Sequence, residues 1–181
     1  MVAQKDGENT ELELSPFRAF FILSKDLSSV ELKSLYGQIR WVEMANKIER
    51  YIEFIAEELK IEIPEIRYRS KLQTDTMLAM ADIQNGILFV KKNLSEDLDV
   101  FFSIAHEMRH LWQAKYKPEF FNGYRTVEEC GHVDIYNAQV AEADANAYAT
   151  TIMEDLFNVT PQFDGLSDAV KNVIYRMAEL M

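Results

Sequence analysis

The sequence predicts an α+β fold in which a small, mostly antiparallel sheet of three strands packs against helices. Asn85-Gly86 between apolar segments at residues 77–83 and 87–91 is a strong local signal of a β-hairpin. Residues 66–70 alternate weakly and predict a third strand. Flanking segments carry apolar residues at three- and four-residue steps, which is typical of amphipathic helices.

The 181 residues fit one domain, at residues 16–181, after a polar and acidic leader at residues 1–15. Ser28 and Glu31 form a capping-box pattern. An apolar stripe follows them, so we expect a long N-terminal helix over residues 28–60.

The second half of the chain predicts further helices. Ser95, followed by acidic residues, is the expected N-cap of a helix that ends before Pro118. Residues 118–133 resemble a loop, and the alanine-rich segment 134–156 predicts a second helix. A short C-terminal helix is expected within residues 167–181.

Composition narrows the function classes. The formal net charge of −11 disfavours nucleic acid and anionic membranes as partners. Cys130 is the only cysteine, so an intramolecular disulfide is excluded. The N-terminus lacks a signal-peptide core, and no apolar run reaches about 18 residues, so we expect a cytoplasmic protein. Nothing in the sequence indicates an oligomeric state.

The segment His106-Glu107-Met108-Arg109-His110 is an H-E-x-x-H motif within a predicted helix. Residues i and i+4 lie about 40° apart around a helix, so His106 and His110 are directed toward one point. Two imidazoles at that spacing suit a shared zinc ion. Glu107, next to the first histidine, is placed to act as a general base on a zinc-activated water.

Catalytic zinc usually has three protein ligands, so a third should come from a later element. Glu142, on the alanine-rich helix, is the best candidate. Asn146 lies one turn later on the same face, where it could hydrogen-bond a ligand imidazole. Asp144 lies about 200° around the helix from Glu142, so the two should not face the same metal.

Several segments of the chain form one recognisable series. They are Asn85-Gly86-Ile87-Leu88-Phe89-Val90, Asn93-Leu94-Ser95, Phe102-x-Ile104-Ala105-His106-Glu107-x-x-His110, and Glu142-x-x-Ala145-Asn146-x-Tyr148-Ala149. This series resembles the core of the ImmA/IrrE-type metallopeptidases, a gluzincin arrangement that the minigluzincins show in minimal form. The resemblance covers roughly residues 66–153, about half of the chain.

The resemblance implies a zincin-like fold, with Zn²⁺ bound by His106, His110 and Glu142 and with Glu107 as general base. It also suggests limited proteolysis of a regulatory protein, in a phage or mobile-element setting. The chain departs from the family in two respects. It has no recognisable helix-turn-helix domain, and its first 60 residues match nothing in the family core. Asn146 stands where many gluzincins carry Asp, although Asn is also common in the ImmA-like branch.

A peptidase needs a group that stabilises the developing oxyanion. His132, Tyr136, Tyr124 and Arg125 are the candidates in or near the segment before Glu142. An extended peptide or protein substrate is expected to pair with an exposed edge of the sheet near the hairpin.

Two other functions remain open from the sequence. One is a catalytically inactive zincin-fold module that binds a protein partner. The other is a structural zinc site, in which His132, Cys130 or Asp134 would supply a fourth ligand.

Overall fold

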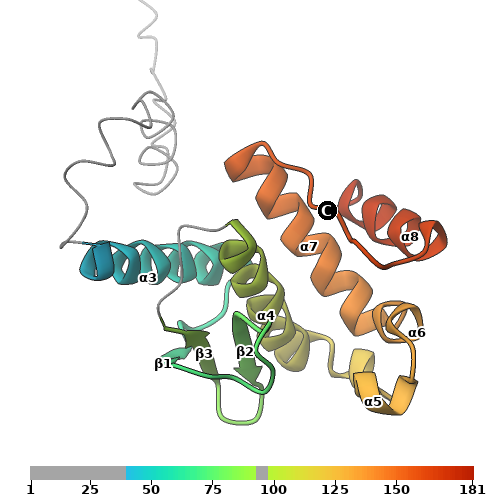
Figure 1. Cartoon of the computed structure of the whole chain (residues 1–181), viewed down its shortest axis with the longest axis horizontal. Coiled ribbons are helices and arrows are strands. Elements are labelled where there is room, and N and C mark those ends of the chain that lie inside the picture. Colours follow the sequence, from blue (N-terminus) through green and yellow to red (C-terminus); the bar gives the residue numbers. More distant parts are fainter. Residues whose placement is uncertain (1–39, 93–97) are drawn as a thin grey trace, which may run out of the picture.

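The computed structural model describes residues 40–92 and 98–181, and Figure 1 shows how their elements are arranged. The predicted leader at residues 1–15, the predicted helix start at Ser28 and the predicted N-cap Ser95 lie outside the described residues. Within the described ranges, no helix is long and apolar enough to cross a membrane.

A three-stranded sheet lies beside the helices. Its strands are β1 (Glu65–Arg69), β2 (Ala79–Asp82) and β3 (Ile87–Lys91), in the order β1-β3-β2. The hairpin prediction is confirmed, because β2 pairs with β3 in antiparallel fashion. The prediction of a mostly antiparallel sheet is wrong, because β1 pairs with β3 in parallel and the sheet is therefore mixed.

Chain direction explains the mixed sheet. The chain reverses between β1 and β2 and again between β2 and β3, so β1 and β3 run the same way. Because β3 lies in the middle, one of its two neighbours must be parallel to it. Ile87, Leu88, Phe89 and Val90 are all buried, as expected for a central strand covered on both faces.

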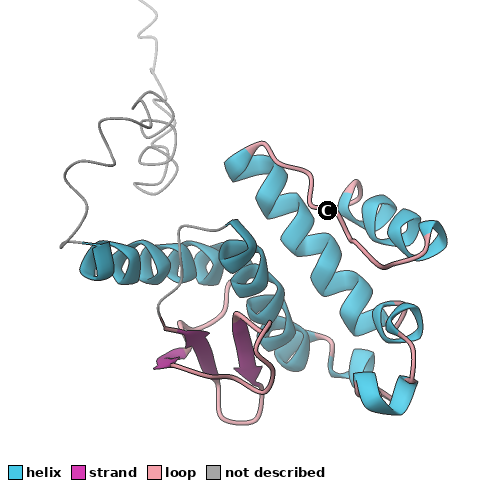
Figure 2. Cartoon of the chain, viewed as in Figure 1, coloured by secondary structure: helices cyan, strands magenta, loops and turns pink. Residues whose placement is uncertain are grey.

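Four longer helices lie on one side of the sheet (Figure 2). They are α3 (Arg40–Leu59), α4 (Leu98–Tyr116), α7 (Val140–Phe157) and α8 (Asp168–Ala178). Helix α4 lies next to the sheet, and α7 and α8 lie farther away. Helix α4 packs against α3, α7 and strand β2, and α8 packs on the other side of α7. Every residue of 141–150 is buried, since the alanines of α7 let its neighbours approach closely.

Short helices replace much of the loop predicted at residues 118–133. They are the 3₁₀ helix η1 (Pro118–Phe121) and α5 (Val127–Cys130), and they are followed by α6 (Val133–Asn137), which lies almost wholly in the next predicted helix. A capping box between Thr126 and Glu129 begins α5. The single helix predicted over 134–156 is wrong, because the chain is extended at Gln139, between α6 and α7. The Gln139 side chain bonds both the N–H and the C=O of Arg125, which holds this break in place.

Candidate metal centre

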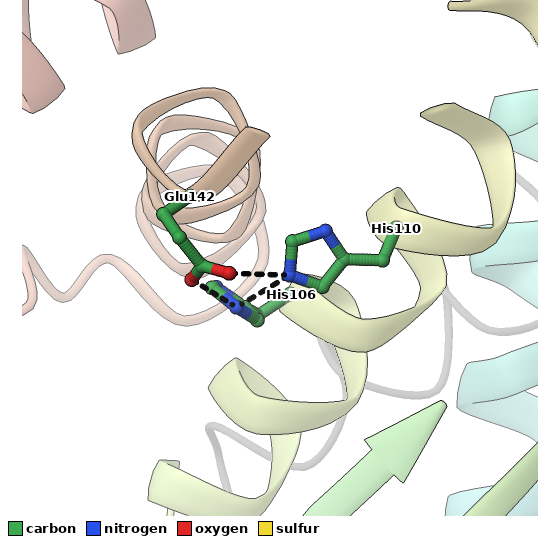
Figure 3. Close-up of side chains that lie close together, drawn as sticks. All are labelled: His106, His110 and Glu142. Carbon is green, nitrogen blue, oxygen red and sulfur yellow. Dashed lines mark hydrogen bonds and ion pairs between the residues drawn. The ribbon is translucent and has the colours of Figure 1, made fainter. Parts of the chain in front are cut away.

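His106, His110 and Glu142 meet between α4 and α7 (Figure 3). The Nε2 atoms of the two histidines are 3.0 Å apart. Glu142 Oε2 lies 3.3 Å from His106 Nε2, and Glu142 Oε1 lies 3.4 Å from His110 Nε2. Helix periodicity aligns the two histidines, and the close packing of α4 on α7 supplies the carboxylate.

The donor set and its spacing fit zinc. Zinc forms bonds of about 2.0–2.1 Å to imidazole nitrogen and carboxylate oxygen, so donors in a tetrahedron lie about 3.3–3.4 Å apart. The three distances above are near that value, with a different carboxylate oxygen of Glu142 facing each histidine. Two histidines and one glutamate also form one of the donor sets of catalytic zinc. These observations show a group that could hold a metal ion.

The proposed fourth ligands of a structural site make other contacts. His132 Nδ1 accepts a hydrogen bond from the backbone N–H of Asp134, and Asp134 accepts one from the N–H of Ser167. The Cys130 thiol is directed toward the carbonyl of Arg125. Within residues 40–92 and 98–181, no fourth His, Cys, Asp or Glu joins the group.

Burial makes the electrostatics of the group strong, because Glu142 is only 1% exposed. Burial alone would raise the pKa of Glu142, but the hydrogen bonds and charges of the two histidines outweigh it, and the pKa is lowered. Burial likewise would lower the pKa of His110. The hydrogen bond and charge of Glu142 reverse that effect and raise the pKa of His110 to about 9.

Two tyrosines stand over the carboxylate of Glu142. The hydroxyls of Tyr124 and Tyr136 lie 2.6 and 2.8 Å from Glu142 Oε1, and 2.8 Å from each other. The two hydroxyls have two protons for these three contacts, so only two can be hydrogen bonds at once. Burial, followed by the charge of Glu142, raises the pKa of both tyrosines, which keeps them neutral donors.

The other two oxyanion candidates lie in different contacts. Arg125 contacts the side chain of Gln139 through its own backbone N–H and C=O. His132 is exposed and is the N-cap residue of α6. The structure therefore brings Tyr124 and Tyr136 to the metal group. The extended residue Gln139 separates α6 from α7, and Tyr136 of α6 contacts Glu142 in the first turn of α7.

Glu107 lies next to the group and contacts the sheet. Its Oε2 accepts a hydrogen bond of 2.8 Å from the backbone N–H of Ala81 on β2. Asp144 faces away from the group, as predicted, and forms a two-point ion pair with Arg109 of α4.

The contacts behind the histidines differ from the prediction. Asn146 donates to Asn137 Oδ1 and makes no hydrogen bond to either imidazole. Gln113 instead contacts His110 Nδ1 at 2.8 Å. Sequence reasoning missed Gln113, although it lies three residues after His110 on the same helix, a spacing that brings side chains together.

Comparison with known proteins finds no matching family model, no matching curated protein and no matching solved structure.

Proposed function

We propose that this protein is a zinc-dependent peptidase of the gluzincin type, with His106, His110 and Glu142 as zinc ligands. The observation that carries the proposal is the cluster of the two Nε2 atoms, 3.0 Å apart, each with a different carboxylate oxygen of Glu142 at 3.3 or 3.4 Å, and with Glu107 beside the cluster. The resemblance of residues 66–153 to ImmA/IrrE-type metallopeptidases supports the same reaction.

Zinc, when bound, would supply a Lewis acid that polarises the peptide carbonyl and lowers the pKa of water, so that the water loses a proton more easily and becomes a stronger nucleophile. Glu107 would accept the proton from the attacking water and deliver it to the leaving amine. Tyr124 or Tyr136 would donate a hydrogen bond to the carbonyl oxygen as negative charge develops on it. Their position supports this role, because both hydroxyls lie beside the metal group, at 2.6 and 2.8 Å from Glu142 Oε1.

Strand β2 offers a place for an extended substrate. It is an edge strand, and the carbonyl of Leu78 pairs with the N–H of Lys91 toward β3. Because strand residues alternate, the backbone groups of Ala79 and Ala81 point away from β3, toward the side where Glu107 lies. A peptide pairing with this edge would pass close to Glu107, which already contacts Ala81.

We further propose that the substrate is a regulatory protein cleaved at limited positions, as the family resemblance suggests. The competing proposal is an inactive zincin-fold module that binds a partner. The presence of Glu107 beside the donor group favours catalysis, since a binding module needs no general base.

The test combines metal analysis with cleavage of a proteome-derived peptide mixture. Wild-type protein should contain about one zinc per chain, and its cleavage should be lost on chelation and restored by zinc. Glu142→Ala should lose the zinc. Glu107→Gln should keep the zinc and lose hydrolysis, so full activity of this variant would refute the mechanism.

A further inference from the structure

We propose that Gln113 is a positioning residue that fixes the imidazole of His110 for metal binding and ties it to the helix that carries Glu142. The inference rests on the proposed metal site and deepens it.

Gln113 is fully buried and uses both ends of its amide. Its Nε2 donates to the carbonyl oxygen of Ala141 at 2.8 Å and to Asp144 Oδ2 at 2.8 Å. Its Oε1 lies 2.8 Å from His110 Nδ1. One side chain of α4 therefore connects a proposed ligand to two points on α7.

The chemistry of these partners determines which way the amide faces. A backbone carbonyl and an ionised carboxylate only accept hydrogen bonds, so both must face the NH₂ group. Asp144 is held in place by its two bonds from Arg109. The oxygen of Gln113 is thereby directed at His110, where it accepts a hydrogen bond from Nδ1–H. With the proton on Nδ1, the lone pair of Nε2 is directed toward the metal group.

The contact with Ala141 adds a second effect. Ala141 immediately precedes Glu142, so Gln113 links the imidazole of one proposed ligand to the backbone beside another. His106 provides a comparison within the same site. Its Nδ1 is buried and has no hydrogen-bond partner among the described residues. Of the two histidines, His110 alone has its far nitrogen fixed in this way.

The test uses the full chain and Zn²⁺, with affinity measured by competition against a chromophoric chelator. Gln113→Met keeps the length of the side chain but removes the amide, and it should weaken zinc binding by about 10- to 100-fold. Gln113→Glu retains an oxygen acceptor behind His110 and should weaken binding less. Gln162→Met makes the same change at an exposed glutamine and should leave the affinity unchanged.

A spectroscopic measurement separates positioning from packing. In the zinc-loaded protein, the Nδ1–H proton of His110 should exchange slowly with solvent in wild type and in Gln113→Glu. It should exchange faster in Gln113→Met, while the Nδ1–H of His106 stays unchanged. The free energy of unfolding of each zinc-free variant measures any loss of stability separately. This matters for Gln113→Glu, which places a second carboxylate beside Asp144.

Wild-type zinc affinity in Gln113→Met, or equal losses in Gln113→Met and Gln113→Glu, would overturn the inference. So would rapid exchange of the His110 proton in wild type, a result that needs no variant to fold. A chain whose zinc affinity depends on Gln113 but which cleaves nothing would refute the peptidase proposal alone. Cleavage with zinc affinity independent of Gln113 would refute this inference alone.

Discussion

The carboxylate of Glu107 accepts a hydrogen bond from the backbone N–H of Ala81, with 2.8 Å between Oε2 and N. This bond joins the proposed general base to the edge strand β2, 26 residues earlier in the chain. It fixes one oxygen of Glu107 and leaves the other available for proton transfer. The proposed general base is therefore oriented by the same strand that we propose for substrate binding.

Ala81→Pro should lower kcat by about 100-fold with zinc content unchanged, because misplacing a catalytic group by about 1 Å has effects of this size. Proline removes the N–H and places its ring where Glu107 now bonds. The β2–β3 ladder should survive, since this N–H faces away from β3 and proline is tolerated on edge strands. Ala81→Gly keeps the N–H and is the matched control. Equal kcat values for the two variants would show that the bond does not position Glu107.

The parts of the site predictable from sequence are those set by local geometry. Helix periodicity alone brings His106 and His110 together, and alanine-rich packing makes Glu142 a reasonable partner. The parallel pairing of β1 was not predictable from alternation, because alternation carries no information on strand order. Gln113 was missed for a related reason. Its role depends on Ala141 and Asp144, which only the packing of α4 on α7 brings near.

The tyrosine pair at Glu142 predicts a catalytic effect. Tyr124→Phe combined with Tyr136→Phe should lower kcat by about 10²- to 10³-fold at saturating zinc, because no hydroxyl remains to stabilise the oxyanion. Each single variant keeps one hydroxyl and should retain more activity than the double variant. Zinc affinity must be measured in parallel, since both hydroxyls contact Glu142. Wild-type kcat in the double variant would exclude both tyrosines from the reaction.

Zinc binding should strengthen as the pH rises from about 6.5 to about 9. Without zinc, burial disfavours the charged form of His110, but Glu142 outweighs burial and raises its pKa to about 9. Zinc requires the neutral imidazole, so binding displaces this proton and the affinity should rise about tenfold per pH unit. Chelator competition across this range measures the slope. His132→Asn changes an exposed histidine outside the group and should show the same dependence of zinc affinity on pH as wild type.

The same proton has the opposite effect on the stability of the zinc-free protein. The pKa of His110 is higher in the folded chain than its usual value of 6.5. The proton on His110 therefore stabilises the folded state, and this stabilisation is complete below about pH 6.5. It is lost as the pH rises through about 9. Urea unfolding in the presence of chelator should therefore show that the free energy of unfolding falls as the pH rises from about 6.5 to about 9. Constant stability and constant zinc affinity between these limits would show that His110 holds no such proton.

The ion pair between Arg109 and Asp144 predicts a large effect on stability. It joins α4 to α7 through contacts of 2.7 and 3.0 Å, and its two side chains are only 14% and 8% exposed. The guanidinium also lies over the ring of Trp112, at 3.7 Å from its centroid. Asp144→Ala would leave this cation buried without a counter-charge. We expect it to lower the free energy of unfolding by about 3–5 kcal/mol.

Replacing both partners should cost less than replacing one. In Arg109→Met combined with Asp144→Leu no charge is left unpaired, so the double variant should be more stable than Asp144→Ala. Urea unfolding with chelator present is the appropriate measurement, because bound zinc would add its own stabilisation to the folded state. If the free energy of unfolding of Asp144→Ala lies within about 0.5 kcal/mol of the wild-type value, the ion pair contributes no more to stability than an ordinary surface contact. In that case the close packing of the alanines, and not this ion pair, holds α7 against α4.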